Sequence, residues 1–116
     1  MKKVLIATLY GADPVLLAIT RLGADRIVLL VDEKPDEVQR EALEKVKKTL
    51  GNVVPIKTVK TSNYDIVEIA TKVVGLIDSK ATDEEIHVNI TSGRKTKAMG
   101  VLFGVYARHD YVTKIS

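Results

Sequence analysis

The sequence contains no cysteine, which excludes disulfide scaffolds, zinc ribbons, iron–sulfur sites and thiol catalysis. It has only two histidines among 116 residues, and this argues against a histidine-rich metal site. Aromatic residues make up 4% of the chain, too few to line an extended groove with platforms for nucleic-acid bases. The longest nearly apolar stretch, residues 98–107, is about half of the roughly 20 residues that a membrane span requires. We therefore expect no metal, no cofactor and no membrane association.

The composition is that of an ordinary globular domain, with 46% hydrophobic and 28% charged residues. A chain of 116 residues fits one domain, and we expect a single ligand-sensing domain over residues 1–116 with no effector domain. The apolar run near the N-terminus stops at a Gly-Ala-Asp-Pro sequence and is interpreted as a core strand rather than a signal peptide, so the expected location is the cytoplasm. The net charge of +3 does not by itself indicate a nucleic-acid partner.

Short apolar runs alternate with helical patterns along the whole chain. The runs predict strands over residues 3–9, 26–31, 53–59, 86–90 and 111–115. The helical patterns predict helices over residues 14–22, 36–50, 64–78 and 95–108, the first with Asp13 as its N-cap. Pro55 favours an edge position for the third strand. On the third helix we expect the buried side to consist of Ile66, Val67, Ala70, Val74 and Ile77.

This βαβαβαβαβ order predicts an α/β domain of the Rossmann-like, doubly wound type. Its five-stranded sheet is mainly parallel and has helices on both faces. In the common strand order 3-2-1-4-5, ligands bind beyond the carboxyl ends of the first and fourth strands. The loops at that edge contain Thr8-Leu9-Tyr10-Gly11 and Thr91-Ser92-Gly93-Arg94-Lys95-Thr96-Lys97.

The second of these loops has the features of an anion site. Gly93 allows a tight turn, and the helix that follows presents unpaired N–H groups. Arg94, Lys95 and Lys97 add cations at a helix start, where the helix dipole disfavours them, so we expect an anion to compensate. No acidic residue occurs from Ile86 through His109. A solvated basic helix start beside a tight turn is the alternative interpretation.

Known phosphate-binding fingerprints do not match this loop. The first glycine of a P-loop would fall at Val88, and Gly11 stands alone after the first strand, so there is no G-x-G-x-x-G motif. ATP hydrolysis and dinucleotide-dependent redox chemistry are therefore disfavoured. Without the glycine motif, Asp32 and Glu33 at the end of the second strand are also disfavoured as ribose-binding carboxylates. Tyr64 has two open interpretations, stacking on an adenine or packing in the core.

The segment VNITSGRKTKAMGVLFGVYA resembles the signature of CARF domains, the CRISPR-associated Rossmann fold. In that family a strand ending in Asn-x-Thr/Ser-x-Gly-x-(Arg/Lys) precedes the fourth helix, and a second motif follows the first strand. The likeness is specific over about residues 89–100, although the order of elements agrees along the whole chain. It implies a homodimer that binds cyclic oligoadenylate, a nucleotide second messenger of type III CRISPR antiviral defence, across its two-fold axis.

The resemblance also implies roles for individual residues. The phosphate ring of the messenger would be lined by Thr91, Ser92, Gly93, Arg94, Lys95 and Thr96. Thr8, Tyr10 and Gly11 would hold it from the first loop, and Lys97 would add positive charge.

Two alternatives to pure sensing stay open. Some relatives are ring nucleases that cleave the messenger without a metal, and in that case Lys95 would stabilise the developing charge while Ser92 or Thr8 orients the attacking 2′-hydroxyl. The second alternative is that the chain is the sensing domain of a DNA-binding transcriptional regulator. Positive charge confined to one loop argues against direct duplex binding by this domain.

Overall fold

The computed structural model describes all 116 residues as five strands and four α-helices in strict alternation. A short 3₁₀ helix, His109–Tyr111, precedes the last strand. The elements, in chain order, are β1 (Lys2–Thr8), α1 (Ala12–Leu22), β2 (Arg26–Asp32), α2 (Glu37–Leu50), β3 (Ile56–Thr61), α3 (Ile66–Asp78), β4 (Glu84–Asn89), α4 (Lys95–Ala107) and β5 (Val112–Ile115).

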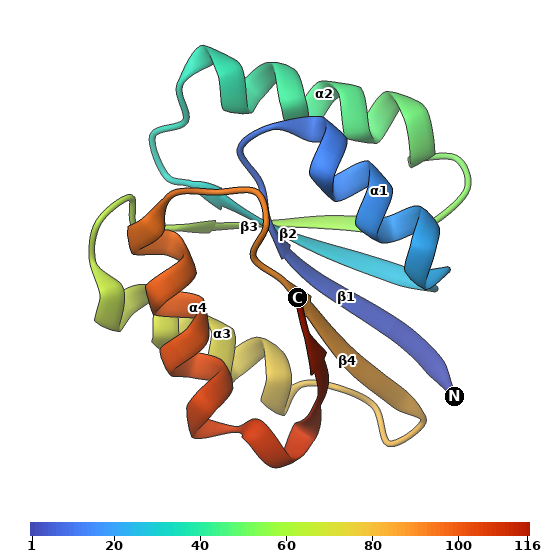
Figure 1. Cartoon of the computed structure of the whole chain (residues 1–116), viewed down its shortest axis with the longest axis vertical. Coiled ribbons are helices and arrows are strands. Elements are labelled where there is room, and N and C mark those ends of the chain that lie inside the picture. Colours follow the sequence, from blue (N-terminus) through green and yellow to red (C-terminus); the bar gives the residue numbers. More distant parts are fainter.

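All five strands are parallel and lie in the order β3-β2-β1-β4-β5, as the sequence predicts for a Rossmann-like, doubly wound domain. Helices α1 and α2 cover one face of the sheet, and α3 and α4 cover the other (Figure 1). The expected edge position of β3 is confirmed, and Pro55 lies immediately before that strand. None of the helices combines the length and the apolar character needed to cross a membrane.

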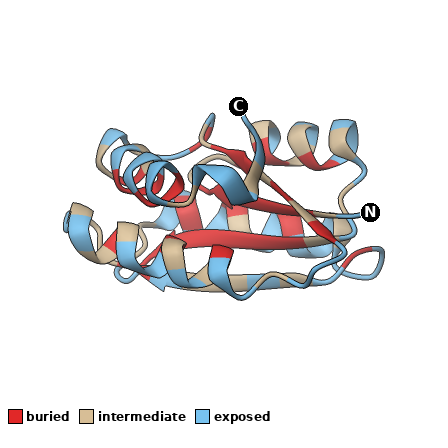
Figure 2. Ribbon diagram, turned by 90° about the horizontal axis from the view of Figure 1, so that it is seen from below, coloured by how far each residue is buried: buried red, intermediate tan, exposed pale blue.

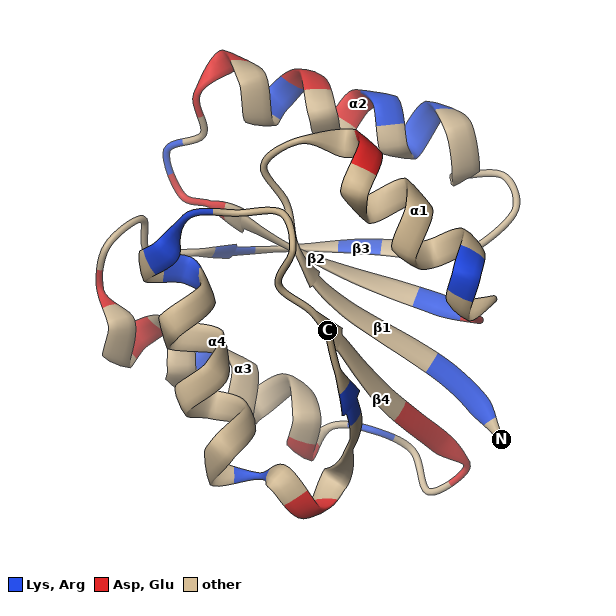
Figure 3. Ribbon diagram, viewed as in Figure 1, with Lys and Arg blue, Asp and Glu red and all other residues tan.

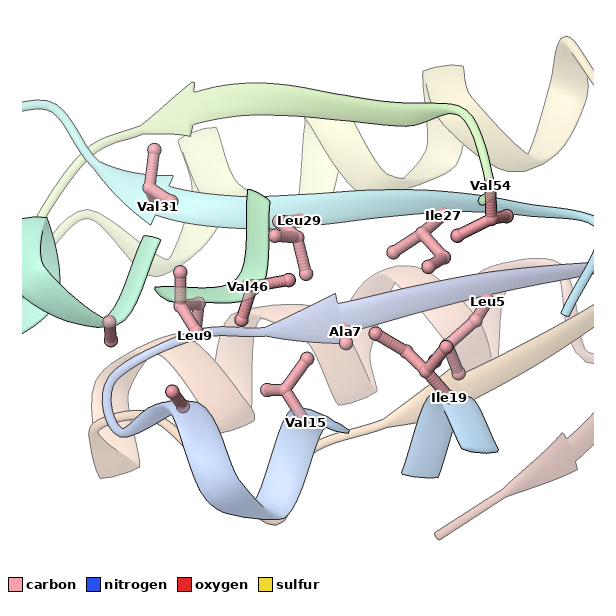
Figure 4. Packing of buried hydrophobic residues seen from close by; sticks show 12 residues of the cluster. Leu5, Ala7, Leu9, Val15, Ile19, Ile27, Leu29, Val31, Val46 and Val54 are labelled. Carbon is pink, nitrogen blue, oxygen red and sulfur yellow. The ribbon is translucent and has the colours of Figure 1, made fainter. Parts of the chain in front are cut away.

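Two hydrophobic layers, one on each face of the sheet, form the core. The layer under α1 and α2 includes Leu29, Val15 and Val46, whose side chains lie between the sheet and these two helices in Figure 4. The layer under α3 and α4 draws on the opposite side chains of β1 and β2, including Ile6 and Leu30. Strands β1 and β2 are therefore buried on both faces, which explains their unbroken apolar sequences. Figure 2 shows the buried residues gathered in the strands between the two helix layers.

The buried side of α3 differs from the sequence prediction. The helix buries Ile69, Val73 and Ile77. Of the predicted set, Ile77 is therefore confirmed, Ile66, Ala70 and Val74 are only partly buried, and Val67 is exposed. Two neighbouring stripes of α3 are apolar, and periodicity alone does not decide which of them faces the core. The geometry of α4 decides it, because Gly100 and Gly104 leave room for Ile69 and Val73. Cβ atoms at these two glycines would lie only 2.6 and 2.8 Å from the Cβ atoms of Ile69 and Val73, respectively.

Helix α1 also begins earlier than predicted. Its N-cap is Gly11 rather than Asp13, and Pro14 lies in the first turn. Proline fits there because the N–H groups of a first turn have no partner within the helix. This shift places the start of α1 directly against the loop that follows β4, where Gly11 makes two hydrogen bonds to Ser92.

Candidate functional site

The candidate site lies at the carboxyl edge of the sheet, where strand order reverses. Strands β1 and β4 are direct neighbours there, with Ala7 paired to Asn89 at the end of their shared register. Helix α1 leaves this edge toward one face and α4 toward the other (Figure 1). The two loops singled out from the sequence therefore meet at one place, as predicted.

Ser92 ties the two loops together. Its hydroxyl Oγ accepts hydrogen bonds from the backbone N–H groups of Tyr10, at 2.8 Å, and Gly11, at 2.9 Å, and donates to the Gly11 carbonyl at 2.9 Å. The Thr8 hydroxyl donates to the Ser92 carbonyl. Both side chains are buried. Their hydroxyls, expected to face a ligand, are occupied in joining the loop after β1 to the loop after β4.

The backbone conformation at position 93 requires a glycine. Its φ of +125° lies in a region that side-chain-bearing residues rarely adopt. A Cβ there would also lie 2.8 Å from the Cβ and 2.9 Å from the Oγ1 of Thr8. The glycine thus lets the turn pass close over the end of β1 while its own backbone stays exposed.

The four helix starts at this edge are not alike. Asp36 caps α2 by accepting from the N–H of Gln39, and Asp65 caps α3 by accepting from the N–H of Glu68. No side chain caps α1 or α4, whose N-cap residues are Gly11 and Arg94. The two helices that follow the adjacent strands β1 and β4 are therefore the two whose first-turn N–H groups receive no side-chain acceptor. Asp13 places a carboxylate in the first turn of α1, whereas the first turn of α4 contains no acidic residue.

The cations at the start of α4 are largely compensated within the chain, contrary to the sequence-based expectation. Lys97 Nζ lies 2.9 Å from Asp32 Oδ1 and donates to the Ser62 carbonyl at 2.8 Å and to the Thr61 hydroxyl. Arg94 Nη2 lies 3.0 Å from Asp36 Oδ2. Figure 3 shows the basic start of α4 close to the acidic connection between β2 and α2. The anion that these cations require is thus supplied by the chain itself.

The remaining cation, Lys95, has a different environment. Its side chain is exposed and makes no ion pair. The five charged side chains Asp32, Asp36, Arg94, Lys95 and Lys97 therefore carry one net positive charge, that of Lys95. Lys97, by contrast, is only 2% exposed and lies beneath the surface of the site.

Arg94 also belongs to a cluster with two tyrosines. Its guanidinium lies 5.4 Å from the centroid of the Tyr10 ring, a cation–π geometry, and Nη1 is 3.5 Å from the Tyr64 hydroxyl. The Tyr10 hydroxyl donates to Asp36 Oδ2 at 2.9 Å. Tyr64 is 70% exposed, so its core-packing interpretation is wrong.

Hydrogen bonds in this cluster shift two pKa values. The N–H of Gln39, the hydroxyl of Tyr10 and the charge of Arg94 lower the pKa of Asp36. The same Asp36 carboxylate raises the pKa of Tyr10. Asp36 is therefore held in its charged form at the rim of the site.

Sequence reasoning missed Asp36, Gln39 and Thr61, and it disfavoured Asp32. Gln39 is buried and connects two loops, because its side chain donates to the Leu9 carbonyl at 2.6 Å and accepts from the N–H of Asp32 at 3.1 Å. Asp32 Oδ2 has no hydrogen-bond partner and lies 3.8 Å from Arg94 Nε. An acidic residue at the end of a buried apolar strand was the available signal for Asp32.

Several of the predicted site residues remain accessible to solvent above these buried side chains. Thr91, Gly93 and Lys95 are exposed, and Tyr10, Gly11, Arg94 and Thr96 are partly exposed. The Thr91 backbone is held by Asn89, whose Oδ1 accepts its N–H at 3.1 Å. The buried members Thr8, Ser92 and Lys97 fix the geometry from below.

The parallel sheet, its strand order and the polar edge between β1 and β4 define a Rossmann-like α/β domain. A family model described as HFX_2341_N-like, N-terminal, matches residues 3–114, and the chain belongs to this family. No curated protein matches the sequence significantly.

Proposed function

We propose that this chain is a CRISPR-associated sensor domain that binds a cyclic oligoadenylate second messenger across a homodimer interface. The observation that carries the proposal is the pair of uncapped helix starts beside the adjacent strands β1 and β4, while α2 and α3 are both capped. A phosphate ligand would supply the missing acceptors at the starts of α1 and α4.

The exposed groups at this edge suit a ring of phosphates. Gly93 presents its backbone without a side chain, and the neighbouring Lys95 is an unpaired cation at the first position of α4. Tyr64 is exposed and within reach of Arg94, which supports its interpretation as a stacking platform for a base. The resemblance of residues 89–100 to the CARF signature supplies the identity of the ligand.

The outer surface of α4 supports the homodimer. Apolar side chains remain exposed along the helix at Met99, Leu102, Phe103 and Tyr106. A helix that is apolar on all sides is normally buried. Because α4 begins at the candidate site, a two-fold axis along its outer surface would bring two copies of the Gly93–Lys95 turn to one ligand.

A ring nuclease on the same site is the second candidate. The exposed Lys95 favours it, because an unpaired cation beside a phosphate can stabilise the charge that develops during cleavage. The hydrogen bonds of Thr8 and Ser92 weigh against it, since those hydroxyls would first have to leave their present partners to orient a 2′-hydroxyl. We therefore rank sensing first and cleavage second.

Isothermal titration calorimetry with cyclic tetra-adenylate and cyclic hexa-adenylate tests the proposal, with linear oligoadenylate as the control. Saturable binding of one ring per two chains is the expected result. An absence of binding to both rings, or equal binding of linear RNA of any sequence, would contradict it. A single-turnover incubation of the labelled ring in EDTA separates the two candidates, because linear products would establish cleavage.

A further inference from the structure

Arg94 is the point at which all four loops at the carboxyl edge of the sheet meet. It lies in the loop after β4 and contacts Tyr10 after β1, Asp36 after β2 and Tyr64 after β3. Its side chain is about one-third exposed, so it reaches solvent at the rim of the site. Any anion that approaches Gly93 and the start of α4 must compete with the partners that Arg94 already has.

The two carboxylates near Arg94 hold it in different ways. Asp32 is 2% exposed and is fixed by Lys97 at 2.9 Å, and its Oδ2 faces Arg94 Nε at 3.8 Å. Asp36 is 39% exposed and contacts Nη2 at 3.0 Å. An ion pair exposed to water contributes little net stability, so the contact with Asp36 is the one that an incoming anion can replace.

Asp36 can release Arg94 without giving up its structural task. Its Oδ1 caps α2 by accepting from the N–H of Gln39 at 2.9 Å. Its Oδ2 accepts from both Arg94 Nη2 and the Tyr10 hydroxyl. When Arg94 turns to another acceptor, the cap and the tyrosine hydrogen bond both stay in place.

We propose that Asp36 is an affinity-determining residue that occupies the position of a ligand phosphate on Arg94, and that ligand binding exchanges this carboxylate for a phosphate. This inference rests on the proposed function. Phosphate and carboxylate oxygens accept from guanidinium in the same geometry, which makes the exchange direct. Asp32 stays beneath as a fixed counter-charge 3.8 Å from Arg94 Nε, so the guanidinium remains anchored at the site when Asp36 is replaced.

The exchange of Asp36 for a phosphate disfavours the binding of small anions that make few other contacts with the site. A single inorganic phosphate must replace Asp36 and remain near its negative charge with little else to hold it. A ligand with several linked phosphates makes contacts at Lys95 and at the uncapped helix starts at the same time, which offset the lost contact. The site thereby selects oligonucleotide phosphates over the small anions of the cell.

Asp36→Asn tests the exchange. The amide oxygen of asparagine keeps the cap of α2, because asparagine is as good an N-cap as aspartate. The amide nitrogen then replaces Oδ2 and accepts neither from Arg94 nor from the Tyr10 hydroxyl, although that hydroxyl can rotate and accept from the amide instead. Cyclic tetra-adenylate should bind this variant about two- to fivefold more tightly than wild type, which corresponds to the loss of one exposed ion pair. Thermal melting should show that both proteins are folded.

Asp65→Asn is the matched control, since Asp65 caps α3 in the same way and does not contact Arg94. It should leave the affinity unchanged. When Arg94 is replaced by alanine, Asp36→Asn should no longer raise the affinity for cyclic tetra-adenylate, because Asp36 competes with the ligand only for the guanidinium.

The outcomes separate the inference from the proposed function. If wild type binds the ring and Asp36→Asn binds equally or more weakly, the exchange is wrong and the sensor function stands. If the gain persists without Arg94, Asp36 acts by general repulsion and the exchange is likewise wrong. If neither wild type nor Asp36→Asn binds either ring, both the sensor function and the inference are overturned.

Discussion

Lys97 on α4 and Asp32 at the end of β2 form an ion pair at 2.9 Å, and each residue is only 2% exposed. Sixty-five positions separate them in the sequence, and β1 lies between β2, which ends at Asp32, and β4, the strand that precedes α4. The pair fixes the start of α4 over the carboxyl ends of β1 and β2. It thereby holds Gly93 and Lys95 at the rim from below.

Lys97→Met should destabilise the fold by about 3–5 kcal/mol, because it leaves the Asp32 carboxylate buried without its partner. The double variant Lys97→Met/Asp32→Asn should recover much of this loss, since both charges are then absent. Urea unfolding followed by circular dichroism measures both free energies. A single variant as stable as wild type would show that the buried pair is unimportant for the fold.

Lys95→Ala should weaken binding of cyclic oligoadenylate about tenfold or more with little change in stability. A charge-assisted hydrogen bond contributes roughly 1.5–3 kcal/mol, whereas an exposed lysine without a partner contributes little to folding. Calorimetry and thermal melting measure the two effects. Lys48→Ala, an exposed lysine on the opposite helix layer, is the control and should change neither. Wild-type affinity in Lys95→Ala would place the phosphates elsewhere.

Gly93→Ala should destabilise the domain by about 1–3 kcal/mol, given its φ of +125° and its contact with Thr8. Gly11→Ala is the matched control on the neighbouring loop, because its φ is −93° and no atom lies within 4 Å of its added Cβ. Chemical denaturation of the two variants compares them directly. Equal stability would contradict the proposed tight passage of the turn over β1.

The order of the elements could be predicted from the sequence because each strand and helix leaves a local pattern. Apolar runs and amphipathic stretches are each recognisable from a few consecutive residues. Pro55 by itself indicates that the third strand lies at the edge of the sheet. The meeting of the two loops after β1 and β4 followed from the common strand order. The fold and the place of the candidate site were therefore accessible without coordinates.

The ion pairs at that site could not be predicted from the sequence in the same way. Asp32 and Asp36 come from a different part of the chain from Arg94 and Lys97, and one sequence does not show which distant side chains meet. One signal was present. Lys97 is on the stripe of α4 that continues through Gly100, Val101, Gly104 and Val105, all of them buried. A lysine on the buried stripe of a helix indicates a buried partner rather than a free cation.

Phe103→Glu tests the proposed homodimer, because Phe103 is 58% exposed in the middle of the apolar outer surface of α4. We expect a dimeric wild type and a monomeric variant in analytical ultracentrifugation. Val38→Glu replaces an exposed apolar residue on α2, in the opposite helix layer, and should leave the dimer intact. A wild type that stays monomeric at high concentration would contradict the interface.

The Arg26–Glu84 ion pair should make stability depend on pH in acid. Arg26 donates from Nε at 2.6 Å and Nη2 at 3.0 Å, the Ala81 N–H donates at 2.8 Å, and together they lower the pKa of Glu84 to about 2. A lowered pKa in the folded state means that the carboxylate stabilises the fold above its usual pKa near 4.5 and loses that effect as the pH falls toward 2. The difference in unfolding free energy between wild type and Glu84→Gln should therefore be largest above about pH 5 and shrink steadily below it. Urea unfolding of both proteins from pH 7 to pH 2 measures this difference, and a constant difference would show that Glu84 does not titrate with folding.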